Sequence, residues 1–360
     1  MADGLRLRPR ARARADTETA GLEAARRAGL PRAGVLRLGS WTALVRYRAS
    51  FFDEALPPLF RGCFHSAARP PRSGTVNAVL YLLDAADAPS LGPQPLDTPI
   101  LRRVRSGAAW EFATRHVAAR IVVNQRPVAI LLWLQESPPG ADPGVMLYHF
   151  TAAVHKILLL LGRMYLHAGA VRVGPRVSLF VGDKGAGKST VCLALARAGA
   201  TVLADDHVLL TRARGRYLVS GCLDSARVTS KTEAWLFDEP LSILPEDVGG
   251  LAKKEFPIAQ FFHAEPHRDR PIHGLFFLQG SDGLALAPLS RAEALRRLVQ
   301  QTAWSHPLVD GADHARYLRY LADLVTAVPA AALGLGPDLD DLAGLAPCLA
   351  QAGRSAHERA

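Results

Sequence analysis

The sequence is poor in cysteine and has no long apolar run. Its 360 residues include four cysteines, and no two of them form a CxxC pair. This spacing excludes a zinc ribbon and a disulfide scaffold, so we expect reduced thiols in a cytoplasmic protein. The longest apolar run, 128–134, is far shorter than the roughly 18 residues of a membrane span. We expect no membrane insertion, and no apolar signal segment follows the basic N-terminus.

Lysine is also scarce. Only six of the 43 basic residues are lysine, and all six lie between residues 156 and 254. This distribution of lysine indicates either that a compact ammonium group is needed in this region or that codon usage is biased. The net charge of +10 comes partly from five arginines between residues 6 and 14, which we expect in a solvated tail. No recognition motif accompanies the charge, so nucleic-acid binding is not expected.

The pattern of apolar runs predicts a tail and two α/β domains. Residues 1–30 read as a basic, flexible tail with a short helix at 17–28. Residues 31–143 form a strand-rich α/β domain of unassigned role, and a Pro-Pro-Gly segment at 138–143 ends it. The predicted elements of this domain are strands at 34–38, 42–47, 78–83, 120–124 and 128–134 and a helix at 51–60.

Residues 144–360 read as a second α/β domain with a mixed sheet. A strand, a glycine loop and a helix follow one another there, which is the unit of an α/β fold. Ser290 and Glu293 have the spacing of a capping box. The predicted strands lie at 165–173, 176–181, 201–204, 208–212, 217–220, 273–278 and 284–288, and the predicted helices at 145–161, 188–198, 292–302, 314–326 and 338–350.

A phosphate-binding loop is the clearest motif. The run Gly182, Asp183, Lys184, Gly185, Ala186, Gly187, Lys188 and Ser189 fits G-x-x-x-x-G-K-[ST] between a predicted strand and a predicted helix. Glycines let backbone N–H groups turn onto phosphate oxygens, and the helix N-terminus adds partial positive charge. We expect Lys188 to bind the β- and γ-phosphates of ATP and the hydroxyl of Ser189 to bind Mg²⁺. Lys184 either touches a phosphate or faces solvent.

Two adjacent carboxylates, Asp205 and Asp206, follow the next predicted strand. A right-handed crossover makes that strand parallel to the one before the loop, so both carboxylates should lie at the same sheet edge as the loop. Neighbouring residues on a strand point to opposite sides, which gives the two different tasks. One could accept a proton from an attacking hydroxyl and the other could support Mg²⁺, or the pair could only form a turn. His167, on the preceding strand, is either structural or a partner of one aspartate, and His207 follows the pair.

These segments resemble one known family. His167-Ala-Gly-Ala-Val171, the loop at 182–189 and Leu203-Ala-Asp-Asp206 resemble the catalytic domain of bacterial HPr serine kinase/phosphorylase and, more closely, the wider set of HPr-kinase-related proteins. The resemblance covers residues 165–210 and extends weakly to about residue 300. It implies a phosphoenolpyruvate-carboxykinase-like fold for the C-terminal domain. It also implies that Asp205 is the general base with His167 beside it and that Asp206 supports metal or phosphate, with the two aspartate roles exchangeable.

The sequence departs from the family at two places. Thr190 follows Gly-Lys-Ser where bifunctional members have glutamate, and only Lys231 or Glu233 falls near the expected signature segment. Phosphorolysis and HPr itself as substrate are therefore not expected. The basic residues best placed to bind phosphate or an acidic substrate are Arg227, Lys231, Lys253 and Lys254.

The sequence as a whole predicts an ATP- and Mg²⁺-dependent kinase. The predicted acceptor is a hydroxyl, on Ser or Thr of a peptide or protein, with Asp205, Lys188, His167 and Asp206 as catalytic residues and 182–190 as the nucleotide loop. Two alternatives stay open: a small-molecule kinase of the same mechanism, and a nucleotide-binding regulatory module without phosphoryl transfer. Family members form homo-oligomers, and nothing in this sequence requires one.

Overall fold

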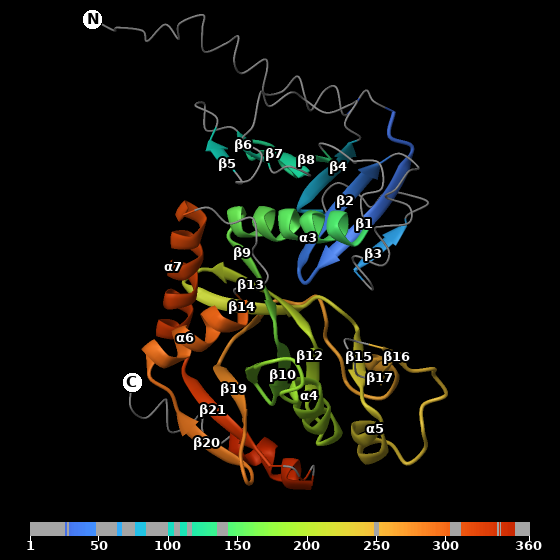
Figure 1. Ribbon diagram of the computed structural model, residues 1–360, viewed down its shortest axis with the longest axis vertical. Coiled ribbons are helices and arrows are strands. Elements are labelled where there is room, and N and C mark those ends of the chain that lie inside the picture. Colours follow the sequence, from blue (N-terminus) through green and yellow to red (C-terminus); the bar gives the residue numbers. More distant parts are fainter. Residues whose placement is uncertain are drawn as a thin grey trace, which may run out of the picture. The chain divides into compact units, whose positions relative to one another are not determined.

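The chain is a mixed α/β protein built mostly of strands (Figure 1). The computed structural model describes residues 26, 29–47, 63–66, 76–83, 100–103, 109–113, 117–134, 143–247, 252–302, 311–336, 338 and 340–349. The predicted helix at 51–60 and nearly all of the predicted tail lie outside these residues. Within the described part, no helix is long and apolar enough to cross a membrane.

The chain divides into two compact units. The first comprises Met1–Arg37, Trp41–Ile157 and Pro307–Ala312, and the second comprises Leu38–Ser40, Leu158–His306 and Asp313–Ala360.

The first unit contains a mixed sheet. Over the described residues its eight strands follow the order β3-β1-β2-β4-β8-β7-β6-β5. β2, β4 and β8 run parallel, whereas β5, β6, β7 and β8 pair antiparallel. The predicted strands match within a few residues, and β3, β5 and β6 were not predicted. The elements are β1 (Arg32–Leu38), β2 (Trp41–Tyr47), β3 (Phe64–Ser66), β4 (Ala78–Leu83), β5 (Ile100–Arg103), β6 (Ala109–Ala113), β7 (Val117–Val122) and β8 (Val128–Leu134), followed by helix α3 (Pro143–Leu160).

The second unit contains three sheets within the described residues. Their orders are β12-β10-β11-β19-β21-β20, β18-β14-β13-β9 and β15-β17-β16. The strands are β9 (Arg163–His167), β10 (Gly169–Val173), β11 (Arg176–Val181), β12 (Thr201–Ala204), β13 (His207–Ala213), β14 (Arg216–Gly221), β15 (Ser225–Val228), β16 (Glu246–Asp247), β17 (Ala252–Pro257), β18 (Arg270–Pro271), β19 (Gly274–Gly280), β20 (Ala285–Pro288) and β21 (Ala330–Leu335). The helices are α4 (Lys188–Arg197), α5 (Ser230–Leu236), α6 (Arg291–Thr302) and α7 (Gly311–Ala327), with 3₁₀ segments η3 (Ile258–Gln260) and η5 (Asp340–Gly344).

The six-stranded sheet is covered on both faces. Leu179 of β11 and Leu275 of β19 belong to a core shared with the four-stranded sheet, α6 and α7. Their neighbours Phe180 and Phe276 point the other way, into a core shared with α4 and the segment of η5. Burial on both faces explains why these strands read as continuous apolar runs. β11 and β12 both run antiparallel to β10, which lies between them, so they run in the same direction, as predicted.

One predicted strand is in fact two. The run 165–173 breaks at Ala168, so β9 pairs with β13 in the four-stranded sheet and β10 pairs with β11 and β12 in the six-stranded sheet. The chain crosses between the same two sheets again at Asp205 and Asp206, which connect β12 to β13. Continuous hydrophobicity hid this break because both strands are buried. The two crossings lie side by side, since Ala170 pairs with Ala204 and His167 pairs with His207.

Other parts of the second unit were missed from the sequence. β15, α5, β16, β17, β18 and β21 were not predicted, because they are short or, in β17, carry two lysines in succession. The predicted helix at 338–350 begins as 3₁₀ turns at Asp340–Gly344. The predicted cap of α6 is present, because the amide of Glu293 donates to the hydroxyl of Ser290 at 3.2 Å.

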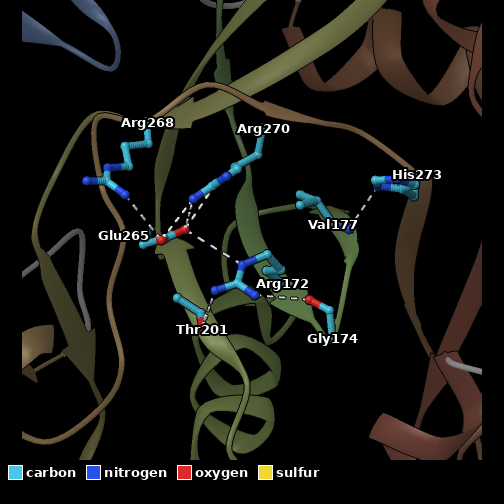
Figure 2. Close-up of polar contacts among 8 residues, drawn as sticks. All are labelled: Arg172, Gly174, Val177, Thr201, Glu265, Arg268, Arg270 and His273. Carbon is cyan, nitrogen blue, oxygen red and sulfur yellow. Dashed lines mark hydrogen bonds and ion pairs between the residues drawn. The ribbon is translucent and has the colours of Figure 1, made fainter.

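A carboxylate with three arginines closes the edge of the six-stranded sheet (Figure 2). Glu265 accepts bonds of 2.8 to 3.1 Å from Arg270, and its Oε2 lies 3.7 Å from Arg172 Nε. Arg268 approaches Glu265 Oε1 to 3.7 Å. The amide of Glu265 also donates to Val202 of the edge strand β12 at 2.9 Å. The cluster thus fastens the segment after η3 over an edge that would otherwise be open to another strand.

We expect Glu265→Gln to loosen this segment. The change leaves three guanidinium groups without their shared carboxylate, and the partial exposure of the cluster limits the loss of unfolding free energy to about 1–2 kcal/mol. Urea denaturation and amide hydrogen exchange at Val202 and Glu265 measure it. Glu239→Gln, at an exposed position outside the cluster, is the control. Equal exchange rates in both variants would contradict the fastening role.

Candidate active site

The phosphate loop connects β11 to α4 and has the backbone that its glycines predict. Gly185 and Gly187 have φ of 85° and 94°, in the left-handed region where other residues are strained. Gly187 is the residue before the first turn of α4, and no side chain caps that turn. Free backbone N–H groups at a helix N-terminus are suited to anions. The loop is therefore shaped for phosphate.

Lys188 lies inside the loop. Its side chain is buried, and its ammonium donates to the carbonyl oxygens of Gly182 at 2.8 Å and Asp183 at 3.1 Å. Burial lowers the pKa of Lys188, while the charges of Asp206 and Asp205 act in the opposite direction. Carbonyl oxygens are weaker partners than phosphate oxygens for an ammonium group, so an anion entering the loop can replace them.

Asp205 is buried at the end of β12. It is 2% exposed, and its Oδ2 accepts a bond of 3.0 Å from the amide of Arg227. Its Oδ1 is buried and has no hydrogen-bond partner among the described residues. Burial and the charge of Asp206 raise the pKa of Asp205 to about 6, although the amide of Arg227 and the hydroxyl of Ser189 oppose this rise.

Gly169 makes room for this arrangement. A Cβ at this position would lie 2.4 Å from the sulfur of Cys192 on α4 and 3.3 Å from the carbonyl oxygen of Asp205. The close approach of β10 to α4 therefore requires glycine here, beside the strand end that carries Asp205.

Asp206 lies between two imidazoles. Its Oδ1 is 2.5 Å from Nε2 of His167, and its Oδ2 is 3.3 Å from Nε2 of His207. The ring of His207 also stacks on Tyr165 with centroids 5.1 Å apart. Burial alone would raise the pKa of Asp206, but the bond from His167 and the charges of both histidines and Lys188 outweigh it and hold this pKa well below its usual range.

The placement of His167 corrects one expectation. The family resemblance implied His167 beside Asp205, whereas the structure places it against Asp206. The reason is register: His167 pairs across the strands with His207, next to Asp206, while Asp205 points into the interior toward Arg227.

His207 differs from His167 in its surroundings. Burial lowers the pKa of His207 to about 4, outweighing the opposing charge of Asp206. At neutral pH its ring is therefore uncharged, and its Nε2 lies 3.3 Å from Oδ2 of Asp206. The sequence assigned His207 no definite role. In the structure it lies beside the carboxylate of Asp206.

The four basic residues proposed from the sequence separate in the structure. Arg227 donates to Glu255 at 2.9 Å, and Lys254 donates to the buried Glu233 at 2.9 Å. Lys231 is exposed on α5. Only Lys253 keeps an electrostatic influence on both Asp205 and Lys188.

The other loop residues fall around this centre. Lys184 is exposed, and Asp183 accepts a bond of 2.5 Å from the amide nitrogen of Gln301 on α6. The hydroxyl of Thr190 lies 3.2 Å from that of Thr232 on α5. Gln301, Thr232 and the backbone of Arg227 were not identified from the sequence, since no motif marks them.

The donor set can hold a hard divalent cation only together with a ligand. Within the described residues, no group of three or more His, Cys, Asp and Glu side chains is arranged to hold a metal ion. Mg²⁺ needs no such group, because it is commonly bound by one or two carboxylates with substrate phosphates and water. Asp205, whose Oδ1 is buried and unpartnered and whose carboxylate interacts with the hydroxyl of Ser189, fits this requirement.

The two aspartates should respond to pH in opposite ways without ligands. Folding raises the pKa of Asp205 from 3.8 to about 6, so its contribution to stability is fully present below pH 3.8 and is lost as pH rises through 6. Relative to wild type, Asp205→Asn should gain about 2–3 kcal/mol more unfolding free energy at pH 8 than at pH 4.

The matched variant Asp206→Asn should behave in the reverse sense. The lowered pKa of Asp206 stabilises the fold above pH 3.8, so this variant should be less stable than wild type at pH 8. Denaturant unfolding at both pH values measures the pair. A change of the same sign in the two variants at pH 8 would contradict the assigned environments.

Comparisons with known proteins place the chain only loosely. No family model matches the sequence, and no curated protein matches it. Among solved structures, the HPr(Ser) kinase/phosphatase from Coxiella burnetii is similar at a TM-score of 0.30 and 12% identity, covering 54% of this chain and 99% of that chain. A likeness this distant does not identify the activity of this chain.

Proposed function

We propose that this chain is an ATP- and Mg²⁺-dependent phosphotransferase that moves the γ-phosphate to a hydroxyl group. One observation carries the proposal: a phosphate loop with a buried lysine faces two strand-end carboxylates, and one of these has a buried oxygen without a partner. The loop amides and Lys188 would bind the phosphates of the nucleotide. Ser189 and Asp205 would hold Mg²⁺, which when bound offsets phosphate charge.

The contacts favour the exchange of aspartate roles that the sequence left open. A base has to meet an acceptor that arrives from solvent, and the side chain of Asp206 is 29% exposed while Asp205 is 2% exposed. Each carboxylate oxygen of Asp206 has a second lone pair beside its imidazole contact. We therefore assign Asp206 as the general base that accepts the proton of the acceptor hydroxyl, with His167 able to relay this proton. Asp205 is assigned as a ligand of Mg²⁺.

Catalysis in this arrangement depends on position and charge. Lys188 and the N-terminus of α4 stabilise negative charge on the phosphates. His167 bonds one oxygen of Asp206 and His207 lies 3.3 Å from the other, so the carboxylate is held between two imidazoles. The acceptor oxygen forms a bond to phosphorus, the bond from phosphorus to the leaving oxygen of ADP breaks, and the hydroxyl proton passes to Asp206. The proposed acceptor is Ser or Thr of a peptide or protein.

We expect transfer of label from γ-labelled ATP to depend on the loop and on Asp206. Wild-type protein with Mg²⁺ and fractionated peptides, proteins and metabolites should label one fraction. Lys188→Ala should lose nucleotide binding, because it removes the ammonium group that takes the place of water around the phosphates. Asp206→Asn should bind nucleotide and lose label transfer at least a hundredfold, the scale of general-base contributions.

Nucleotide binding by wild type without label transfer to any fraction would overturn the kinase proposal and leave a regulatory nucleotide-binding module. Activity retained in Asp206→Asn and lost in Asp205→Asn would instead reverse the two assigned roles. Arg291→Ala, a change of a basic residue on the surface of α6, is the control for both outcomes.

A further inference from the structure

The sheet of β15, β17 and β16 contacts the site through the backbone of β15, and one of its faces carries charged side chains. On that face, Ser225 donates to Glu255 at 2.7 Å, and Arg227 donates to the same carboxylate at 2.9 Å. Arg227 also supplies the amide that binds Asp205. Since residues two apart on a strand share a face, Lys253 lies on the same face as Glu255.

The next lysine belongs to the opposite face. Lys254 donates to Glu233 and to the carbonyl of Leu241, and Phe256 is buried in the core beneath α5. The two successive lysines of β17 therefore have different surroundings. Lys254 holds the fold of this segment together. Lys253 lies on the face of the sheet that carries Glu255.

Lys253 has no partner within the described part of the chain. It is half-buried, and among those residues no carboxylate lies within ion-pair distance of it. An ammonium group that is partly shielded from water and has no carboxylate partner is available to an anionic ligand. Its charge nonetheless acts on Asp205 and on Lys188.

Two ammonium groups and a helix N-terminus therefore act on the same small region. Lys188 lies within the loop, the first turn of α4 adds partial positive charge, and the charge of Lys253 on β17 acts on both Lys188 and Asp205. Like charges repel, and an anion between the two lysines adds to the compensation that Asp205 and Asp206 already give Lys188. Lys188 reaches the phosphates from inside the loop, so Lys253, on a different sheet, is placed for the outermost phosphate.

We propose that Lys253 binds the γ-phosphate of the nucleotide and distinguishes ATP from ADP. This inference rests on the proposed function, since it needs the phosphate loop to bind a nucleoside triphosphate. Lys253 then stabilises the group that is transferred, while Lys188 binds the β-phosphate, which ATP and ADP share, as well as the γ-phosphate. In the nucleotide complex, Lys253, the one unpartnered lysine among the described residues, would thus be paired with a negatively charged phosphate.

Binding of Mg²⁺ with ADP and with a non-hydrolysable ATP analogue, measured by calorimetry, tests this inference without knowledge of the acceptor. Lys253→Ala should weaken the ATP analogue by about tenfold to a hundredfold, the scale of a charged contact, and leave ADP within about twofold. Lys253→Arg should restore most of the preference. Lys188→Ala should weaken both nucleotides, and Arg291→Ala, at an exposed position on α6, should weaken neither.

The outcomes separate the two proposals. Wild-type protein that binds neither nucleotide would overturn the proposed function. Wild type that binds both, with Lys253→Ala matching it or weakening ADP and ATP analogue equally, would overturn only the role of Lys253. Thermal unfolding of each variant without ligand serves as the folding control, and Lys253→Met, which keeps the length of the side chain, replaces Lys253→Ala if the latter melts early.

Discussion

A carboxylate buried beside a buried ammonium group is the constraint around which the second unit is organised. Asp205 and Lys188 are both nearly removed from water, and neither is fully compensated by the other. A charge in such a place requires hydrogen bonds from several elements. The loop carbonyls accept hydrogen bonds from Lys188, and the amide of Arg227 donates a hydrogen bond to Asp205. One oxygen of Asp205 still has no hydrogen-bond partner, and a bound ligand or cation would satisfy it.

The two crossings between sheets give this constraint its geometry. Ala168 and the pair Asp205 and Asp206 are the points where the chain leaves one sheet for the other. Because the strands on either side are hydrogen-bonded to one another, the backbone of the two aspartates is held by both sheets. The site is thereby held by the backbone of the core rather than by a surface loop.

Much of this site could be predicted from the sequence, since its parts are local. The loop has a fixed spacing, and the backbone at Gly185 and Gly187 has the predicted conformation. The direction of β12 followed from the handedness of one crossover. The partners of the carboxylates could not be predicted, because they depend on register between distant strands. Thus His167 lies against Asp206, and the break at Ala168 was hidden by uniform hydrophobicity.

The bond from residue 227 to Asp205 comes from the main chain, and this has a consequence for divergence. A backbone N–H is supplied by every amino acid except proline, so the identity of residue 227 is free to change while the bond to the carboxylate persists. Substitutions at this position remove the side-chain bond to Glu255 but leave the bond to the buried carboxylate in place. Sequence comparison would lose such a segment early, whereas the path of its backbone would stay recognisable for much longer.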